Sequence, residues 1–423
     1  MASLSANISE TALNAPVAPK ERIVAIDVVR GFALFGVLLV NMMYFAWPIY
    51  RQVLDIPWTH PVDRFSHGLL IFLAEGKFFT LFSLLFGLGL ALQMRRSEGI
   101  VSRFMRRMLV LLGFGLAHML LLWYGDILIY YALLGMLLLL FRNCQPRTLL
   151  RWAISLLLLP IVLNGGLFAL ISLGQNDPEV AAEIQAGFEQ SQVEYRQLYD
   201  QAIQSYQQGS FADMVNVRIG EYAFGTLGTL LNGMLFMVLA MFLLGLYIGK
   251  RQILQDIPAH LPLFRRVRAW GFGVGLLANA GYTLLYYVSN LSEPSLAVVA
   301  AVLTFVIGAP ALCLAYASSI VLLYQQSQWR RRLQPLAAVG RMALSNYLAQ
   351  SIIATTLFFG YGFGLYASLS PTLGIGLTLV IFSVQIVLSR WWLQHYRFGP
   401  AEWLWRSLSY GRPQTMRLEP TSN

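Results

Sequence analysis

Long apolar runs separated by short polar connections dominate this chain. A helix needs about 20 mostly apolar residues to cross a bilayer core roughly 30 Å thick. Lipid offers no partner for a free backbone N–H or C=O, so such runs must be helical. The pattern predicts an all-α, polytopic transmembrane helical bundle of about ten spans, over residues 24–46, 67–94, 105–124, 125–141, 149–172, 222–249, 268–289, 296–324, 336–360 and 371–394.

Basic residues fall on alternate connections between these runs. They concentrate in residues 95–107, 142–151, 250–268, 330–341 and 397–417, and the other connections hold few. Short cytoplasmic loops carry an excess of arginine and lysine. Ten spans with both termini in the cytoplasm satisfy this alternation throughout.

The same pattern divides the chain into five parts. Residues 173–221 carry eight of the 20 acidic residues, and their apolar positions are spaced as in an amphipathic helix. This connection either covers an outer opening or separates two five-span halves. The predicted parts are a polar cytoplasmic segment (1–22), an N-terminal half (23–172), the acidic extracytoplasmic connection (173–221), a C-terminal half (222–395), and an interfacial helix with a cytoplasmic tail (396–423).

Composition supports a membrane protein and narrows its partners. Hydrophobic residues make up 57% of the chain and charged residues 12%, against about 25% charged in soluble domains. The net charge is +10, and only three of the 30 basic residues are lysines. The basic residues lie beside the apolar runs, so membrane lipids rather than nucleic acid are the expected partners. Cys144 and Cys313 suggest neither a disulfide framework nor a metal site. We expect no tightly bound cofactor.

The first run carries a charged pair and an amide. Asp27 and Arg30 are three residues apart, so they can pair on one helix face. Asn41 follows Arg30 by eleven residues, about three turns, and returns to that face.

The second run carries Glu75 and Lys77 on either side of Gly76. Residues two apart do not face each other on a helix, and the glycine allows a local break. A break at membrane depth is acceptable only beside a cavity. The alternative is a buried structural ion pair.

The stretch "AHMLLLWYGD" places His118 near the end of one run and Asp126 at the start of the next. A carboxylate at a helix start can cap the helix. It can also orient the imidazole of His118, which would then act as a general base.

On the predicted topology, six polar groups fall in the outer half of the bilayer. Ionisable groups there are costly and usually face a partner or a wet cavity. The sequence therefore predicts a polar chamber open to the outside. Acyl transfer needs a base and groups that stabilise an oxyanion, and proton-coupled transporters use similar groups. The six are Asn41, His67, Glu75, Lys77, His118 and Asp126.

The stretch "GRMALSNYLAQS" adds Arg341, Asn346 and Gln350. Asn346 and Gln350 are four apart and share a helix face, which suits hydrogen bonds between helices. The alternative is a cytoplasmic mouth in which Arg341 binds an anion, such as the phosphates of coenzyme A.

Five motifs in order give the chain a family resemblance. From residue 22 to residue 411 it resembles the YeiB-like bacterial inner-membrane proteins, a family carrying a domain of unknown function. This resemblance implies a multi-pass protein of the bacterial cytoplasmic membrane. The motifs are "AIDVVRGFALFGVLLVNM", "EGKFFTLFSLLFG", "AHMLLLWYGDILIYYALLG", "GRMALSNYLAQS" and "GPAEWLWRSLSYG".

YeiB-like proteins are distantly similar to membrane-bound sugar O-acyltransferases and to heparan glucosaminide N-acetyltransferase. The O-acyltransferases have an Arg-Gly pair followed, eleven residues after the Arg, by a catalytic His. Here Arg30-Gly31 is present and Asn41 occupies the matching position. The glucosaminide enzyme resembles this chain in having Asn there, with its working His further on, which implies His60 or His67.

The resemblance and the chamber together predict an acyltransferase. Acyl-coenzyme A would enter from the cytoplasm, held by Arg30 and Arg341, and a sugar, lipid or polyol would receive the acyl group. His118 would be the base, oriented by Asp126, with Lys77 and Asn41 stabilising charge. The predicted catalytic set is His118, Asp126, Lys77 and Glu75, and the substrate-binding set is Asn41, His67, Arg30, Arg341 and Asn346. A transporter or lipid translocator, or a sensor without turnover, are the alternatives.

Overall fold

The computed structural model describes residues 23–54, 56–94 and 100–418. In these residues the chain is all-α and has no β-strand, which confirms the predicted fold class. The predicted N-terminal segment 1–22 lies outside the described residues. The α-helices are α2 (Val24–Ala46), α3 (Pro61–Leu73), α4 (Lys77–Met94), α5 (Ile100–Leu121), α6 (Leu128–Leu138), α7 (Pro146–Gly174), α8 (Pro178–Gln208), α9 (Phe211–Leu231), α10 (Met234–Lys250), α11 (Leu261–Val288), α12 (Leu296–Tyr324), α13 (Ser327–Arg341), α14 (Ala343–Phe358), α15 (Pro371–His395) and α16 (Pro400–Tyr410).

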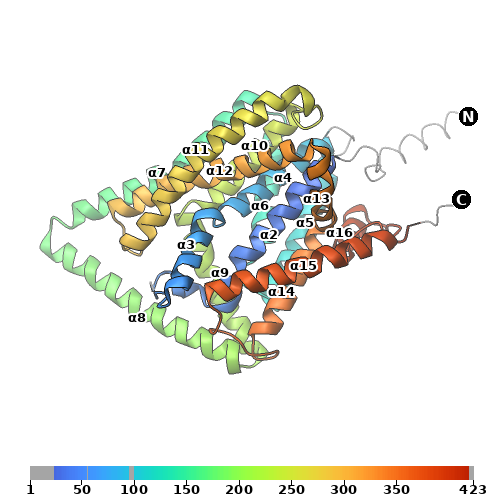
Figure 1. Ribbon diagram of the computed structural model, residues 1–423. Coiled ribbons are helices and arrows are strands. Elements are labelled where there is room, and N and C mark those ends of the chain that lie inside the picture. The colour runs from blue at the N-terminus through green and yellow to red at the C-terminus, as the bar shows by residue number, and fades with distance from the viewer. Residues whose placement is uncertain (1–22, 55, 95–99, 419–423) are drawn as a thin grey trace, which may run out of the picture.

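Helix α2 is the centre of the bundle. It packs against α4, α12, α13, α14 and α15, and Figure 1 shows it between α4 and the pair α14 and α15. Most of its side chains are buried, including Leu34, Leu38 and Met42. A helix that is apolar on nearly all sides can be surrounded by other helices or by lipid. Helix α7 is as apolar as α2 and is mostly exposed, so the central position of α2 is a finding of the structure.

The predicted count of ten spans is not confirmed. Six described helices are long and apolar enough to cross a membrane, or seven if the bent pair α9 and α10 forms one span. The other predicted spans are helical but differ in form. Residues 125–141 give a short apolar helix, and 336–360 are divided into α13 and α14 at Met342. The predicted span 268–289 corresponds to the later part of α11, which ends at Val288.

The acidic connection is a helix, as its apolar spacing predicts. Helix α8 runs for 31 residues along one side of the molecule and joins the end of α7 to the start of α9 (Figure 1). Asp177 caps its first turn, and its polar face is exposed. Only its last turns bury side chains, among them Tyr199 and Tyr206.

Helices α13 and α2 approach closely near Arg30. A methyl group on Gly31 would lie 2.1 Å from the backbone oxygen of Leu336, and one on Gly340 would lie 1.9 Å from that of Asp27. Small residues allow helix backbones to come this close in membrane proteins. The contact places the last turn of α13 beside the start of α2. It therefore brings Arg30 next to Gly340 and Arg341.

Candidate functional site

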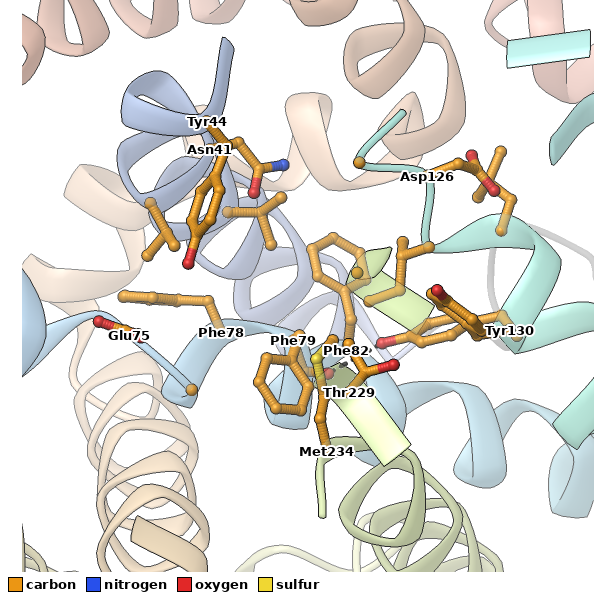
Figure 2. A pocket seen from close by; sticks show the side chains of 18 of the residues that line it. Asn41, Tyr44, Glu75, Phe78, Phe79, Phe82, Asp126, Tyr130, Thr229 and Met234 are labelled. Atoms are coloured by element: carbon orange, nitrogen blue, oxygen red, sulfur yellow. Dashed lines mark hydrogen bonds between the residues drawn. The ribbon is translucent and has the colours of Figure 1, made fainter. Parts of the chain in front are cut away.

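One large cavity of about 840 Å³ runs through the bundle, lined by the described residues. Its walls come mainly from α2, α4, α5, α9, α12 and α14, and they are rich in aromatic rings (Figure 2). Polar groups gather at two ends. The arginine end holds Arg30, Arg107, Arg341 and Arg406, and the amide end holds Asn41, Tyr44, Gln52, Glu75 and Glu221.

Helix α2 connects the two ends. Arg30 and Asn41 both line the cavity, as their spacing on one helix face predicts. Eleven residues of α-helix rise about 16 Å. A ligand of that length lying along α2 would therefore reach from the arginine end to the amide end.

Glu75 reaches the cavity because the helix breaks beside it. Helix α3 ends at Leu73 and α4 begins at Lys77, and Gly76 between them has a φ of 82°. This left-handed conformation favours glycine. The predicted break is confirmed, and Glu75 lines the cavity together with Tyr44 (Figure 2). The structure shows no hydrogen bond from another described residue to the carboxylate of Glu75.

Lys77 stabilises the break in the helix and does not reach the cavity. Its ammonium group is fully buried and donates a hydrogen bond to the backbone oxygen of Ile71 at 2.8 Å. Thr80 likewise donates to the backbone oxygen of Gly76 at 2.9 Å. Carbonyls freed by a broken helix need partners at membrane depth, and these side chains supply them. Lys77 is not among the residues that line the cavity.

A second break also borders the cavity. Helices α9 and α10 meet at an angle of 65°, and Gly233 between them has a φ of 86°. Its neighbours Asn232 and Met234 line the cavity. The sequence alone predicts only the break at Gly76, because Gly233 is one of several glycines in apolar runs and no charged residue flanks it.

Among the described residues that line the cavity, the arginine end has four arginines and one carboxylate, that of Glu402. Arg30 donates to Asp27 at 2.8 Å, which confirms the predicted pair. Arg107 lies over the ring of Trp405, 4.5 Å from its centroid, and its buried Nε has no hydrogen-bond partner among the described residues. Arg341 donates to the backbone oxygen of Arg397 at 3.5 Å.

The remaining carboxylate at the arginine end is used by the protein itself. Glu402 of α16 accepts hydrogen bonds from the backbone N–H groups of Leu344 and Ser345 at 2.6 and 3.2 Å, and its second oxygen bonds the Ser345 hydroxyl. Burial raises the pKa of the Glu402 carboxyl, and the hydrogen bonds from Ser345 and Leu344 oppose this rise. A carboxylate at the start of α14 satisfies N–H groups that have no partner inside the helix.

His118 and Asp126 are in contact, as predicted. The ring Nδ1 of His118 lies 2.9 Å from Asp126 Oδ2, and both side chains are fully enclosed. Asp126 Oδ1 accepts the backbone N–H of Ile129 at 2.8 Å, so the predicted cap is also present. The other ring nitrogen, Nε2, lies 2.7 Å from the hydroxyl of Ser351. Asp126 lines the cavity and His118 does not.

The predicted chamber therefore gathers only part of its set. Asn41, Glu75 and Asp126 line the one cavity, whereas His67, Lys77 and His118 lie behind its walls. His67 lies 3.0 Å from the hydroxyl of Tyr287, and His60 precedes α3 at the surface. Neither histidine that the resemblance implies is part of the cavity lining.

Asn346 and Gln350 hold helices together. Asn346 donates to Ser389 at 2.9 Å and Gln350 donates to Gln385 at 2.8 Å, so α14 is tied to α15. This is the predicted interhelical bonding, and Asn346 does not line the cavity. Its role in substrate binding stays a prediction. Within the residues described, no group of three or more His, Cys, Asp and Glu could hold a metal ion.

Several site residues carry no clear signal in the sequence. Arg107 and Arg406 lie in basic stretches that the loop pattern explains fully. Glu221 lines the cavity, bonded to the backbone of Ile49 at 3.1 Å and the hydroxyl of Tyr206 at 2.7 Å. Ser351 closes the stretch "GRMALSNYLAQS", but a serine in a span more often bonds its own helix.

Comparison with known proteins places the chain in a family. YxaH of Bacillus subtilis is 37% identical over 417 residues, covering 93% of this chain and 96% of the relative. The chain belongs to the YeiB-like family. YeiB of Escherichia coli is 30% identical over 400 residues, covering 92% of this chain and 96% of the relative. Residues 248–412 match the family model described as protein of unknown function DUF418. Both relatives are described as uncharacterized.

Proposed function

We propose that this member of the YeiB-like family is an acyltransferase of the bacterial cytoplasmic membrane. It would move an acyl group from cytoplasmic acyl-coenzyme A to a sugar, lipid or polyol of the envelope. One observation carries the proposal: a single cavity joins a cluster of arginines to a polar region about three helical turns away along α2.

The arginine end suits the donor. Guanidinium groups bind phosphates through paired, charge-assisted hydrogen bonds. Arg30 and Arg341 come from adjoining helices, and Arg107 adds a buried Nε that has no partner in the described chain. Coenzyme A carries its phosphates at one end and its thioester at the end of a flexible arm. Phosphates held here would let the arm extend along α2.

The amide end suits the acceptor. Asn41 offers an amide donor, and the carboxylate of Glu75 faces the cavity. A carboxylate can accept a hydrogen bond from a sugar or polyol hydroxyl and orient it. The proposed base is His118, whose contact with Asp126 fixes the ring. Lys77 acts on Glu75 through its charge, behind the wall of the cavity.

Thiol release tests the proposal. Purified protein in detergent is given acetyl-coenzyme A and envelope extract, and free thiol is followed. We expect turnover, and we expect Arg341→Ala to raise the KM for the donor by about 10- to 100-fold, since a charged hydrogen bond contributes about 1.5–3 kcal/mol. Arg266→Ala is the matched control, because this arginine lies outside the cavity. Donor KM that does not change in Arg341→Ala would count against the donor site.

A transporter is the second candidate, and the two helix breaks favour it. Transporters often place their substrate between two broken helices. Both Gly76 and Gly233 have positive φ at cavity-lining turns. Proteoliposomes that move an amphiphilic anion across the bilayer without releasing thiol would support transport and remove the acyltransferase proposal.

A further inference from the structure

Three buried polar side chains lie in close contact beside the cavity and are here called the relay. Ser351 and His118 share a hydrogen bond, whereas the facing atoms of His118 and Asp126 lie at ion-pair distance without one. The three side chains come from three elements: Ser351 from α14, His118 from α5, and Asp126 from the turn before α6. Ser351 Oγ lies 2.7 Å from His118 Nε2, and His118 Nδ1 lies 2.9 Å from Asp126 Oδ2. All three are buried, with exposures of 0%, 2% and 2%.

The surrounding contacts favour one arrangement of the protons. Asp126 is held by the backbone N–H of Ile129, and its second oxygen faces the imidazole. A carboxylate oxygen beside Nδ1 favours a proton on that nitrogen, and the neutral ring then presents a lone pair at Nε2. Ser351 has one other acceptor, the backbone oxygen of Tyr347 at 3.4 Å, which is much farther than Nε2. In this tautomer the hydroxyl of Ser351 donates to the histidine.

This order is that of an activated nucleophile. A nucleophile within hydrogen-bond reach of a base, with the base oriented by a third group, recurs on unrelated folds and is recognised by geometry. A serine that only joined helices would need one acceptor. Here the acceptor is itself held by a carboxylate, at a depth where each ionisable group is costly.

Ser351 does not line the cavity, and Tyr347 is the cavity-lining residue of α14 nearest to it in the chain. Tyr347 lies four residues before Ser351, on the same face of α14. Its ring centroid is 5.1 Å from that of His118. Its hydroxyl lies 3.5 Å from the backbone oxygen of Gly125, at the limit of a hydrogen bond. A ligand that reaches Ser351 from the cavity would require this ring to rotate.

We propose that Ser351 carries the acyl group as an ester between donor and acceptor, which rests on the proposed acyltransferase function. Ser351 Oγ attacks the thioester carbonyl while His118 Nε2 takes its proton. The C–S bond breaks, and the departing sulfur takes that proton to leave as free thiol. The acceptor hydroxyl then gives its proton to Nε2 and attacks the ester, and Ser351 Oγ leaves with the proton.

An alkyl fluorophosphonate tests the relay without a donor. We expect the probe to label the wild-type protein at Ser351, identified by peptide mass spectrometry. Labelling should be lost in Ser351→Ala and slowed at least about 100-fold in His118→Ala. Tyr347→Ala should label faster because the path is open. Ser389→Ala, a buried serine that bonds Asn346 outside the relay, should label as wild type.

The outcomes separate the two proposals. Folded wild-type and Tyr347→Ala proteins that both resist the probe would overturn the nucleophile, with folding checked by thermal unfolding. Thiol release that persists unchanged in Ser351→Ala would overturn it and leave the acyltransferase standing. Labelling at Ser351 without thiol release from acyl-coenzyme A would support the relay and remove the acyltransferase. An acetyl mass on Ser351 after rapid quenching would support both.

Discussion

Replacing Gly31 with alanine should separate α2 from α13 and disturb the arginine end. The new methyl would lie 2.1 Å from the backbone oxygen of Leu336, whereas ordinary contacts begin at 3.4 Å. The helices must move apart by about 1.3 Å, and the obstacle is a helix backbone that cannot rotate away. Overpacking typically costs 1–3 kcal/mol, and we expect about 3 kcal/mol here.

Thermal unfolding in detergent measures this cost. The KM for the acyl donor measures whether the displacement of Arg30 and Gly340 weakens donor binding. A misplacement of 1 Å can reduce catalysis by about 100-fold. Gly113→Ala is the matched control, since Gly113 lies on an exposed face of α5 with nothing within 4 Å. It should stabilise by up to about 1 kcal/mol through helix propensity. Equal stability of Gly31→Ala and the wild type would refute the close contact.

Three further substitutions test the local structure. Gly76→Ala should lower the free energy of unfolding by about 1–2 kcal/mol because the φ of Gly76 is positive. A thermal unfolding midpoint as high as that of Gly89→Ala would contradict this. Lys77→Met should leave the backbone oxygen of Ile71 without its donor and cost about 1–3 kcal/mol; unchanged hydrogen exchange at the end of α3 would argue otherwise. Glu402→Ala should cost about 1–2 kcal/mol and expose α16 to protease, and a cleavage pattern like that of the wild type would rule out the cap.

Local features of the site follow from the sequence. The break at Gly76, the cap by Asp126 and the pair of Asp27 and Arg30 each depend on residues close together in the chain. Backbone conformation and short-range spacing determine them, so they can be predicted without knowing which helices are neighbours.

Long-range features do not follow in the same way. Whether a polar residue faces the shared cavity or a private partner depends on how the helices are rotated. His118 contacts Ser351, which is 233 residues away, and Asn346 donates to Ser389 on another helix. No period in the sequence reports such a rotation when a span is apolar on every side.

The predicted number of spans is not confirmed, for a related reason. Hydropathy measures whether a segment is soluble in lipid, and it does not show where the helix bends. The runs that contain Gly233 and Met342 satisfy the count, yet each is divided at a turn that lines or adjoins the cavity.

The bond between Glu402 and the start of α14 has a consequence for biosynthesis. Glu402 is synthesised 58 residues after Leu344, so the whole of α14 is made before the carboxylate that caps its first turn. A chain that ended before α16 would lack this cap and also the Glu402 and Arg406 side chains that line the cavity.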